Sequence, residues 1–118
     1  VCVASKVAID IKPGSFPNSI NLRNNGNVPV AILGSYDFSV KDVDLGTVTF
    51  AGAKPVTAGK SGVKGCFQDV NGDGIVDVVL HFKTQDLDLQ PGDTVGTVSG
   101  FTLSGQMFVG TDSVRIVK

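Results

Sequence analysis

The segment from Asp69 to Asp77 carries oxygen-bearing side chains at a regular spacing. With Asp69 as position one, side-chain oxygens fall at positions one, three, five and nine, and a glycine, Gly74, stands at position six. Calcium takes about six to eight oxygen ligands at about 2.3–2.6 Å, and alternate residues of a tightly curled loop can all point inward at that distance. The spacing therefore predicts a site for Ca²⁺ or a similar hard cation. The expected ligands are the side chains of Asp69, Asn71, Asp73 and Asp77 and the carbonyl of Ile75.

The alternative is a turn that uses these residues only for their backbone geometry. Asn and Gly suit such a turn because they tolerate positive φ angles. This alternative does not explain the three aspartates within nine residues, because their charges would repel one another without a cation. A further ligand would be water or a carboxylate from elsewhere, such as Asp10 or Asp93. At Gly74, we expect a Cβ atom to obstruct the bend.

The two flanks of this loop predict strands. An EF-hand would have a bidentate Glu at position twelve, where this chain has Leu80, and would have helices on both sides, as a dockerin pair also does. The run from Phe67 to Gly74, followed by Asp77 to Leu80, instead resembles the strand–loop–strand calcium loops of FG-GAP repeats. An FG-GAP propeller needs several such blades, and this chain has one loop, so only the loop chemistry carries over.

The strands that must position this loop are indicated by alternation and by turn residues. Val76, Val78, Leu80 and Phe82 fall on one face of a strand, and Asp77, Val79, His81 and Lys83 on the other. Fifteen glycines separate further short apolar stretches. These stretches are Val3–Ile11, Ile20–Arg23, Val28–Leu33, Thr47–Ala51, Val63–Val70, Thr94–Leu103 and Phe108–Val117. The pattern predicts an all-β fold, an antiparallel β-sandwich of about seven to nine short strands, with a small barrel as the competing closure.

Three local features sharpen this prediction. The run Asn24–Asn27 is typical of a hairpin turn that leads into the strand at Val28. Pro29 lacks an N–H group, so its strand should lie at a sheet edge or carry the proline at a non-bonded position. Lys41–Leu45 could form a single helical turn.

Composition limits the classes of function. The chain has 118 residues and 12.2 kDa, which predicts one domain over 1–118. Hydrophobic residues make up 42% and charged residues 18%, which is too apolar for disorder. A net charge of -1 gives no attraction for phosphate, so nucleic acid is not an expected partner. No stretch approaches the roughly 18 apolar residues of a membrane-spanning helix, so membrane insertion is not expected.

The two cysteines, Cys2 and Cys66, are too few for a zinc site with one histidine. As a disulfide they would close a loop of some sixty residues, worth about 4 kcal/mol, and would indicate an oxidising compartment. Two unrelated thiols are the alternative. Because the sequence begins at Val1 without an initiator methionine, we expect a processed product or an excised module.

The sequence gives little support for catalysis. His81 is the only histidine, no spacing places a nucleophile beside it, and no Gly-x-Ser-x-Gly elbow is present. Asp86 and Asp88 could form a pair of catalytic carboxylates as in glycosidases, but the simpler interpretation is a solvent-exposed turn. The chain is therefore expected not to be an enzyme. A carbohydrate-binding module would favour an exposed Trp or Tyr platform, and the chain offers only Tyr36.

The wider chain resembles a domain that recurs in secreted and surface proteins of bacteria and archaea. The resemblance rests on Ile9–Asn21, Val28–Leu33, the acidic loop with Val79–Phe82, and Gly110–Val117. It implies a secreted or cell-surface module, attached to something larger, whose partners would be neighbouring domains, a surface protein or a glycan. The expected function is a non-catalytic, calcium-stabilised module with an architectural or interaction role. The alternative is a calcium-dependent carbohydrate-binding module.

Overall fold

The fold is built almost entirely from short strands. The computed structural model describes residues 5–13, 18–23, 25–36, 38–56 and 65–117. The strands are β1 (Ser5–Lys6), β2 (Ile9–Ile11), β3 (Ser19–Asn21), β4 (Asn27–Ile32), β5 (Val43–Phe50), β6 (Gly65–Gln68), β7 (Asp77–Lys83), β8 (Val95–Thr102), β9 (Met107–Ser113) and β10 (Arg115–Val117). Two single 3₁₀ turns accompany them, η1 (Val40–Asp42) and η3 (Thr84–Asp86). The predicted all-β class is confirmed, with ten strands described where about seven to nine were expected.

The strands form three separate hydrogen-bonded sheets within the described residues. One four-stranded sheet has the order β1-β9-β8-β5, the other has the order β2-β4-β7-β6, and β10 pairs with β3. Most neighbours are antiparallel, as predicted, but β1 runs parallel to β9 and β10 runs parallel to β3. A barrel, the competing closure, would require one sheet that closes on itself, and the described strands form separate sheets instead.

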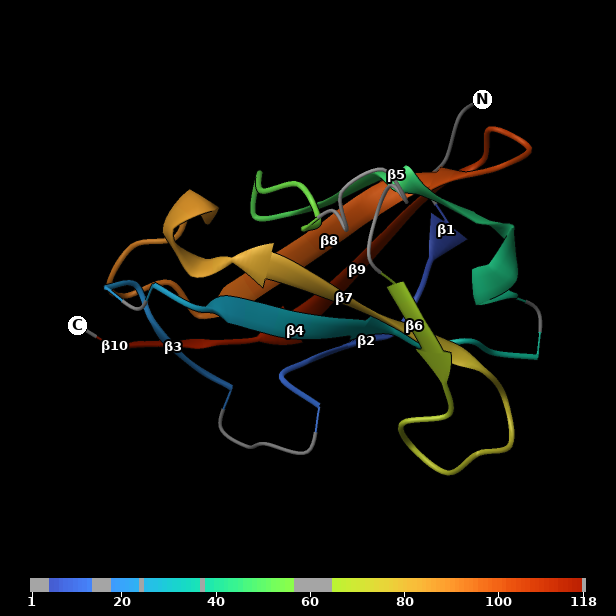
Figure 1. Ribbon diagram of the computed structural model, residues 1–118, viewed down its shortest axis with the longest axis horizontal. Coiled ribbons are helices and arrows are strands. Elements are labelled where there is room, and N and C mark those ends of the chain that lie inside the picture. The colour runs from blue at the N-terminus through green and yellow to red at the C-terminus, as the bar shows by residue number, and fades with distance from the viewer. Residues whose placement is uncertain (1–4, 14–17, 24, 37, 57–64, 118) are drawn as a thin grey trace.

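Both four-stranded sheets bury residues in one hydrophobic cluster. Figure 1 shows β4 and β7 in front of β8 and β9, with the strands of the two layers crossing at an angle. Val30 and Leu80 come from the front sheet and Val98 and Phe108 from the rear one, and all four are fully buried. The rings of Phe50 in β5 and Phe82 in β7 meet across the layers at 5.5 Å and an interplanar angle of 59°. This shared core fixes the ends of the strands and hence the loops that join them.

Strand β7 carries the predicted alternation and is buried more completely than expected. Val78, Leu80 and Phe82 are inaccessible to solvent, whereas Val76 lies before the strand and is 38% exposed. On the other face Asp77 is also inaccessible, and Val79 is only 6% exposed. The cause is position, since β7 is a central strand between β4 and β6.

Pro29 does not lie on an edge strand, because β4 is hydrogen-bonded to both β2 and β7. The second alternative, a non-bonded position, is confirmed. Pro29 pairs with His81, and its carbonyl accepts the N–H of Lys12 at 2.8 Å. The N and O of one residue in an antiparallel strand point to the same side. The proline nitrogen therefore faces β2 just past its last residue, Ile11, and the ladder to β7 loses no hydrogen bond.

Two local predictions need correction. The run Asn24–Asn27 does not close a hairpin, because β3 pairs with β10 and β4 pairs with β2 and β7; Asn24 itself is outside the described residues. The helical turn expected at Lys41–Leu45 is shifted to Val40–Asp42, and β5 begins at Val43. In both places tertiary pairing overrides the local signal.

The packing of the two sheets predicts a large difference between two strand glycines. A Cβ on Gly96 would lie 2.7 Å from Cε1 of Phe50 and 2.9 Å from Cδ1 of Ile11, whereas a Cβ on Gly46 would have its nearest neighbour at 3.7 Å. Gly96→Ala should lower the unfolding free energy by about 1–3 kcal/mol through overpacking. The matched variant Gly46→Ala should change it by less than about 0.5 kcal/mol. Thermal denaturation of both variants checks this, and equal melting temperatures would contradict it.

Candidate metal centre

The loop between β6 and β7 is curled around the Asp69 carboxylate. Oδ1 of Asp69 accepts the N–H of Gly72 at 2.9 Å, and Oδ2 accepts the N–H of Gly74 at 2.8 Å. The N–H of Gly74, and to a smaller degree that of Gly72, lowers the pKa of this carboxyl below its usual 3.8. Asp69 is thus held in its ionised form by the backbone of its own loop.

The next two polar side chains of the loop make similar short-range contacts. Oδ1 of Asp73 accepts the N–H of Ile75 at 2.9 Å, and Oδ1 of Asn71 accepts the N–H of Asp73 at 3.4 Å. Each side chain thus accepts an N–H two residues further along the loop. These are the contacts by which Asp and Asn close turns in general.

Asp77 connects the loop to the sheet. Its side chain is inaccessible to solvent, Oδ1 accepts the N–H of Gly34 at 2.7 Å, and Oδ2 accepts the N–H of Val70 at 2.9 Å. Val70 lies at the entry of the loop, and Gly34 lies just past the end of β4. One buried carboxylate therefore joins both ends of the loop to a neighbouring segment of the fold.

These interactions bring three of the predicted ligands together. One carboxylate oxygen from each of Asp69, Asp73 and Asp77 lies within 4.8 Å of the other two, with Asp69 and Asp73 exposed and Asp77 buried. Such a group of hard oxygen donors could hold a metal ion. The side chain of Asn71 belongs to the same turn, and the roles of Asn71 and of the Ile75 carbonyl as ligands stay predictions.

The two remote carboxylates considered as further ligands lie outside this group. Asp10 is in β2, where burial and then the charge of Asp112 raise the pKa of its carboxyl. Oδ2 of Asp93 instead accepts the N–H of Gln90 at 2.8 Å. Neither residue completes the acidic group in the structure, so a further ligand would have to be water or another group.

Gly74 does lie at a bend of the loop, as predicted, but the predicted reason, obstruction by a Cβ atom, is wrong. Gly74 has a φ of +81° and Gly72 a φ of +75°, conformations that L side chains rarely adopt. However, an added Cβ on either residue would meet no atom within 4 Å. Glycine is favoured at both positions because any other residue would be strained at these φ angles, and not because a Cβ would clash with a neighbouring atom.

Gly34 is a site residue that sequence reasoning missed. A Cβ on Gly34 would lie 2.2 Å from the carbonyl oxygen of Val76 and 2.9 Å from Cγ2 of Ile75. Only a glycine lets the segment after β4 approach the loop closely enough for its N–H to reach Asp77. A single glycine between two apolar stretches carries no such signal in the sequence, because the partner lies more than forty residues away.

The remaining candidates do not join this site. Cys66 is exposed in β6 and has no disulfide partner within the described part of the chain; because Cys2 lies outside that part, the Cys2–Cys66 disulfide stays a prediction. His81 is half-buried, and its buried Nδ1 has no hydrogen-bond partner in the described part of the chain. No helix within the described ranges is long and apolar enough to cross a membrane.

Comparison of the chain with models of known protein families, with curated proteins and with solved structures gives no match. The chemistry of the site therefore rests on its own geometry.

The contacts of Asp77 predict a structural role that needs no metal. Asp77→Asn replaces one accepting oxygen by an NH₂ group that faces an N–H donor, so it should lower the unfolding free energy by about 1–3 kcal/mol in chelator. Asp73→Asn is the matched control, because its remaining oxygen can still accept the N–H of Ile75. Thermal denaturation in EDTA measures both variants. Equal stability of Asp77→Asn and the wild type would show that the buried contacts do not hold the loop.

The contacts of Asp69 predict a low titration midpoint without any cation. Because the folded pKa is lowered, the stability from this carboxylate is present above the usual value of 3.8 and is lost as the pH falls through the folded pKa. A ¹³C carboxyl titration of the folded protein in chelator should place the midpoint of Asp69 below 3.8. A midpoint at or above that value would mean that the Gly72 and Gly74 hydrogen bonds do not form in solution.

Proposed function

We propose that this chain is a non-catalytic calcium-binding module, stabilised by an ion in the loop 69–77, with an architectural or interaction role in an exported or cell-surface protein. The observation that carries the proposal is the convergence of three carboxylates, from Asp69, Asp73 and Asp77, within 4.8 Å. Two of them are exposed, so water can occupy further coordination positions.

The donor set favours calcium over other ions. The group contains only oxygen donors, whereas zinc and copper sites in proteins use His or Cys. Magnesium requires near-ideal octahedral geometry at about 2.0–2.1 Å, which ligands from a single loop meet less readily than the longer and more variable geometry of a calcium shell. Position twelve is Leu80, which is fully buried in β7 and supplies no bidentate carboxylate.

The missing bidentate ligand also favours an extracytoplasmic setting. Extracellular calcium modules work with dissociation constants of about 10⁻⁴–10⁻³ M, and fewer charged ligands give weaker sites. A site with three carboxylates, two of them exposed, suits this range better than that of a cytosolic sensor. The resemblance to secreted and surface modules supports the same location.

An ion in the loop would act on stability through Asp77 and its neighbours. It would offset the repulsion among three close negative charges. It would also hold the loop at the end of β7, where the buried Asp77 contacts Gly34 beyond β4. Calcium at tenfold its dissociation constant adds about 1.4 kcal/mol to the unfolding free energy. The architectural role follows from this, because the ion would tie the β6–β7 loop to the segment after β4.

One observation favours the alternative, a calcium-dependent carbohydrate-binding module. The only tyrosine, Tyr36, is fully exposed, and it stands two residues after Gly34, which contacts the loop. An exposed aromatic ring on the segment that contacts the proposed calcium loop is a combination that can bind a sugar. Retention of the protein on immobilised glycans in calcium, and its release by EGTA, would favour this alternative over a purely architectural role.

Calcium should raise the melting temperature of the purified protein, and EDTA should lower it by several degrees. Magnesium at the same concentration should restore less stability. Asp73→Ala should remove most of the calcium response, because it deletes an exposed ligand. Asp88→Ala is the matched control, since Asp88 is exposed and lies outside the acidic group. Differential scanning calorimetry with metal analysis measures the effect, and identical melting curves in calcium and EDTA would refute the proposal.

A further inference from the structure

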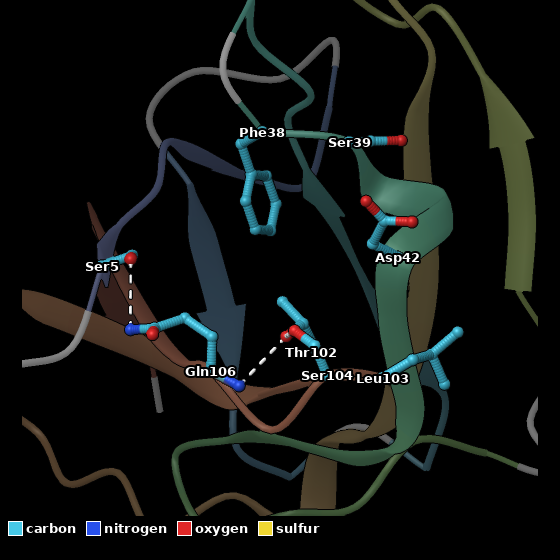
Figure 2. Close-up of a pocket in the computed structure, with 8 residues that line it drawn as sticks. All are labelled: Ser5, Phe38, Ser39, Asp42, Thr102, Leu103, Ser104 and Gln106. Carbon is cyan, nitrogen blue, oxygen red and sulfur yellow. Dashed lines mark hydrogen bonds between the residues drawn. The ribbon is translucent and has the colours of Figure 1, made fainter. Parts of the chain in front are cut away.

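A pocket that shares no lining residue with the acidic loop lies where η1 faces the β8–β9 hairpin. This cavity, called here the η1 pocket, has a volume of about 470 Å³ (Figure 2). Phe38, Ser39 and Asp42 form one wall, and the turn at 102–106 together with Ser5 of β1 forms the other. Its volume lies within the range of about 300–1,000 Å³ that is typical of small-ligand pockets.

Hydrogen bonds hold the two walls in place before any ligand binds. The N–H of Leu103 donates to the carbonyl of Asp42 at 2.7 Å, which joins the hairpin to η1. Within the turn, the N–H of Thr102 donates to the carbonyl of Gln106 at 2.8 Å, and the hydroxyls of Thr102 and Ser104 are 2.9 Å apart. A pocket that is already formed costs less ordering entropy when a ligand enters.

The apolar part of the pocket is the ring of Phe38. Phe38 packs against the fully buried Phe108 with a centroid distance of 5.6 Å and an angle of 56°. Figure 2 shows the Phe38 ring projecting into the hollow between η1 and the hairpin. Leu103, which is 71% exposed, adds apolar surface at the rim.

The polar part of the pocket is acidic or neutral. The only charged side chain among the described lining residues is Asp42, which is exposed and whose carboxylate makes no hydrogen bond or ion pair within the described part of the chain. The other polar groups are hydroxyls and one amide, from Ser5, Ser39, Thr102, Ser104 and Gln106. Without a cationic partner, this lining disfavours phosphate and carboxylate ligands.

We propose that the η1 pocket binds one sugar unit of a neutral saccharide. A sugar ring carries hydroxyl groups at its edge and C–H groups on its faces. Asp42 would accept hydrogen bonds from neighbouring hydroxyl groups, which are stronger when the acceptor is charged. The Phe38 ring would lie against a C–H face. None of the described lining residues belongs to the loop 69–77, so binding here needs no calcium and is independent of the proposed function.

The test is a titration of the ¹⁵N-labelled full chain in EGTA with methyl α-mannoside, methyl β-galactoside, methyl β-glucoside and N-acetylglucosamine. We expect at least one of these sugars to shift the amide signals of Ser39, Asp42 and Leu103 with a dissociation constant of about 1–10 mM, which is a weak interaction. Asp42→Asn should weaken binding by about tenfold or more, because a charged acceptor is lost. Asp88→Asn is the matched control, since the backbone N–H of Asp88 donates to the carbonyl of Ala51, just past the end of β5 that is far from Asp42.

Several results would overturn the proposal. They are the absence of shifts at these amides with every sugar, shifts that Asp42→Asn leaves unchanged, and binding that appears only when calcium is added. Shifts with tetramethylammonium and with none of the sugars would assign the pocket to cationic ligands instead. Because the calcium-dependent melting temperature of Asp42→Asn should equal that of the wild type, failure of the sugar site is distinguishable from failure of the calcium site.

Discussion

The buried carboxylate of Asp77 is the interaction on which the candidate site depends. Burying a carboxylate away from water costs free energy unless hydrogen-bond donors of the protein replace the water. Here Gly34 and Val70 supply one N–H each. Because the two donors come from the segment after β4 and from the entry of the loop, satisfying this one group fixes both relative to β7. The acidic side chains of the loop then face one another as a consequence of the fold.

This arrangement explains why a short, exposed loop can have a defined shape before any ion binds. Asp69 accepts two N–H groups of its own loop, and these donors favour the charged form of the carboxyl and lower its pKa. The repulsion among the three carboxylates opposes the same geometry. A divalent cation bound as proposed would stabilise this loop further, because it would offset the repulsion that the backbone hydrogen bonds alone oppose.

The segment after β4 links the acidic loop to the η1 pocket. Gly34 contacts the loop, Ser35 pairs with Phe38 through two backbone hydrogen bonds, and Phe38 forms a wall of the η1 pocket. In Figure 1 the loop before β7 lies beyond one end of β6, and η1 lies on the same side of the view. The connection between β4 and β5 therefore contributes residues both to the contact with the acidic loop and to one wall of the η1 pocket.

The sequence by itself determined the elements with strong local signals. The alternation from Val76 to Phe82 predicts a strand, and the spacing of Asp69, Asp73 and Asp77 predicts which carboxylates converge, because both depend on near neighbours in the chain. The all-β class follows from many short apolar stretches separated by glycines and other turn residues. Only the tertiary structure decided the central position of β4, the parallel pairs of β1 and β10, the close approach of Gly34, and the pocket between η1 and the hairpin. Each of these depends on contacts between residues far apart in the chain, and side-chain periodicity carries no information about which distant strand becomes the partner.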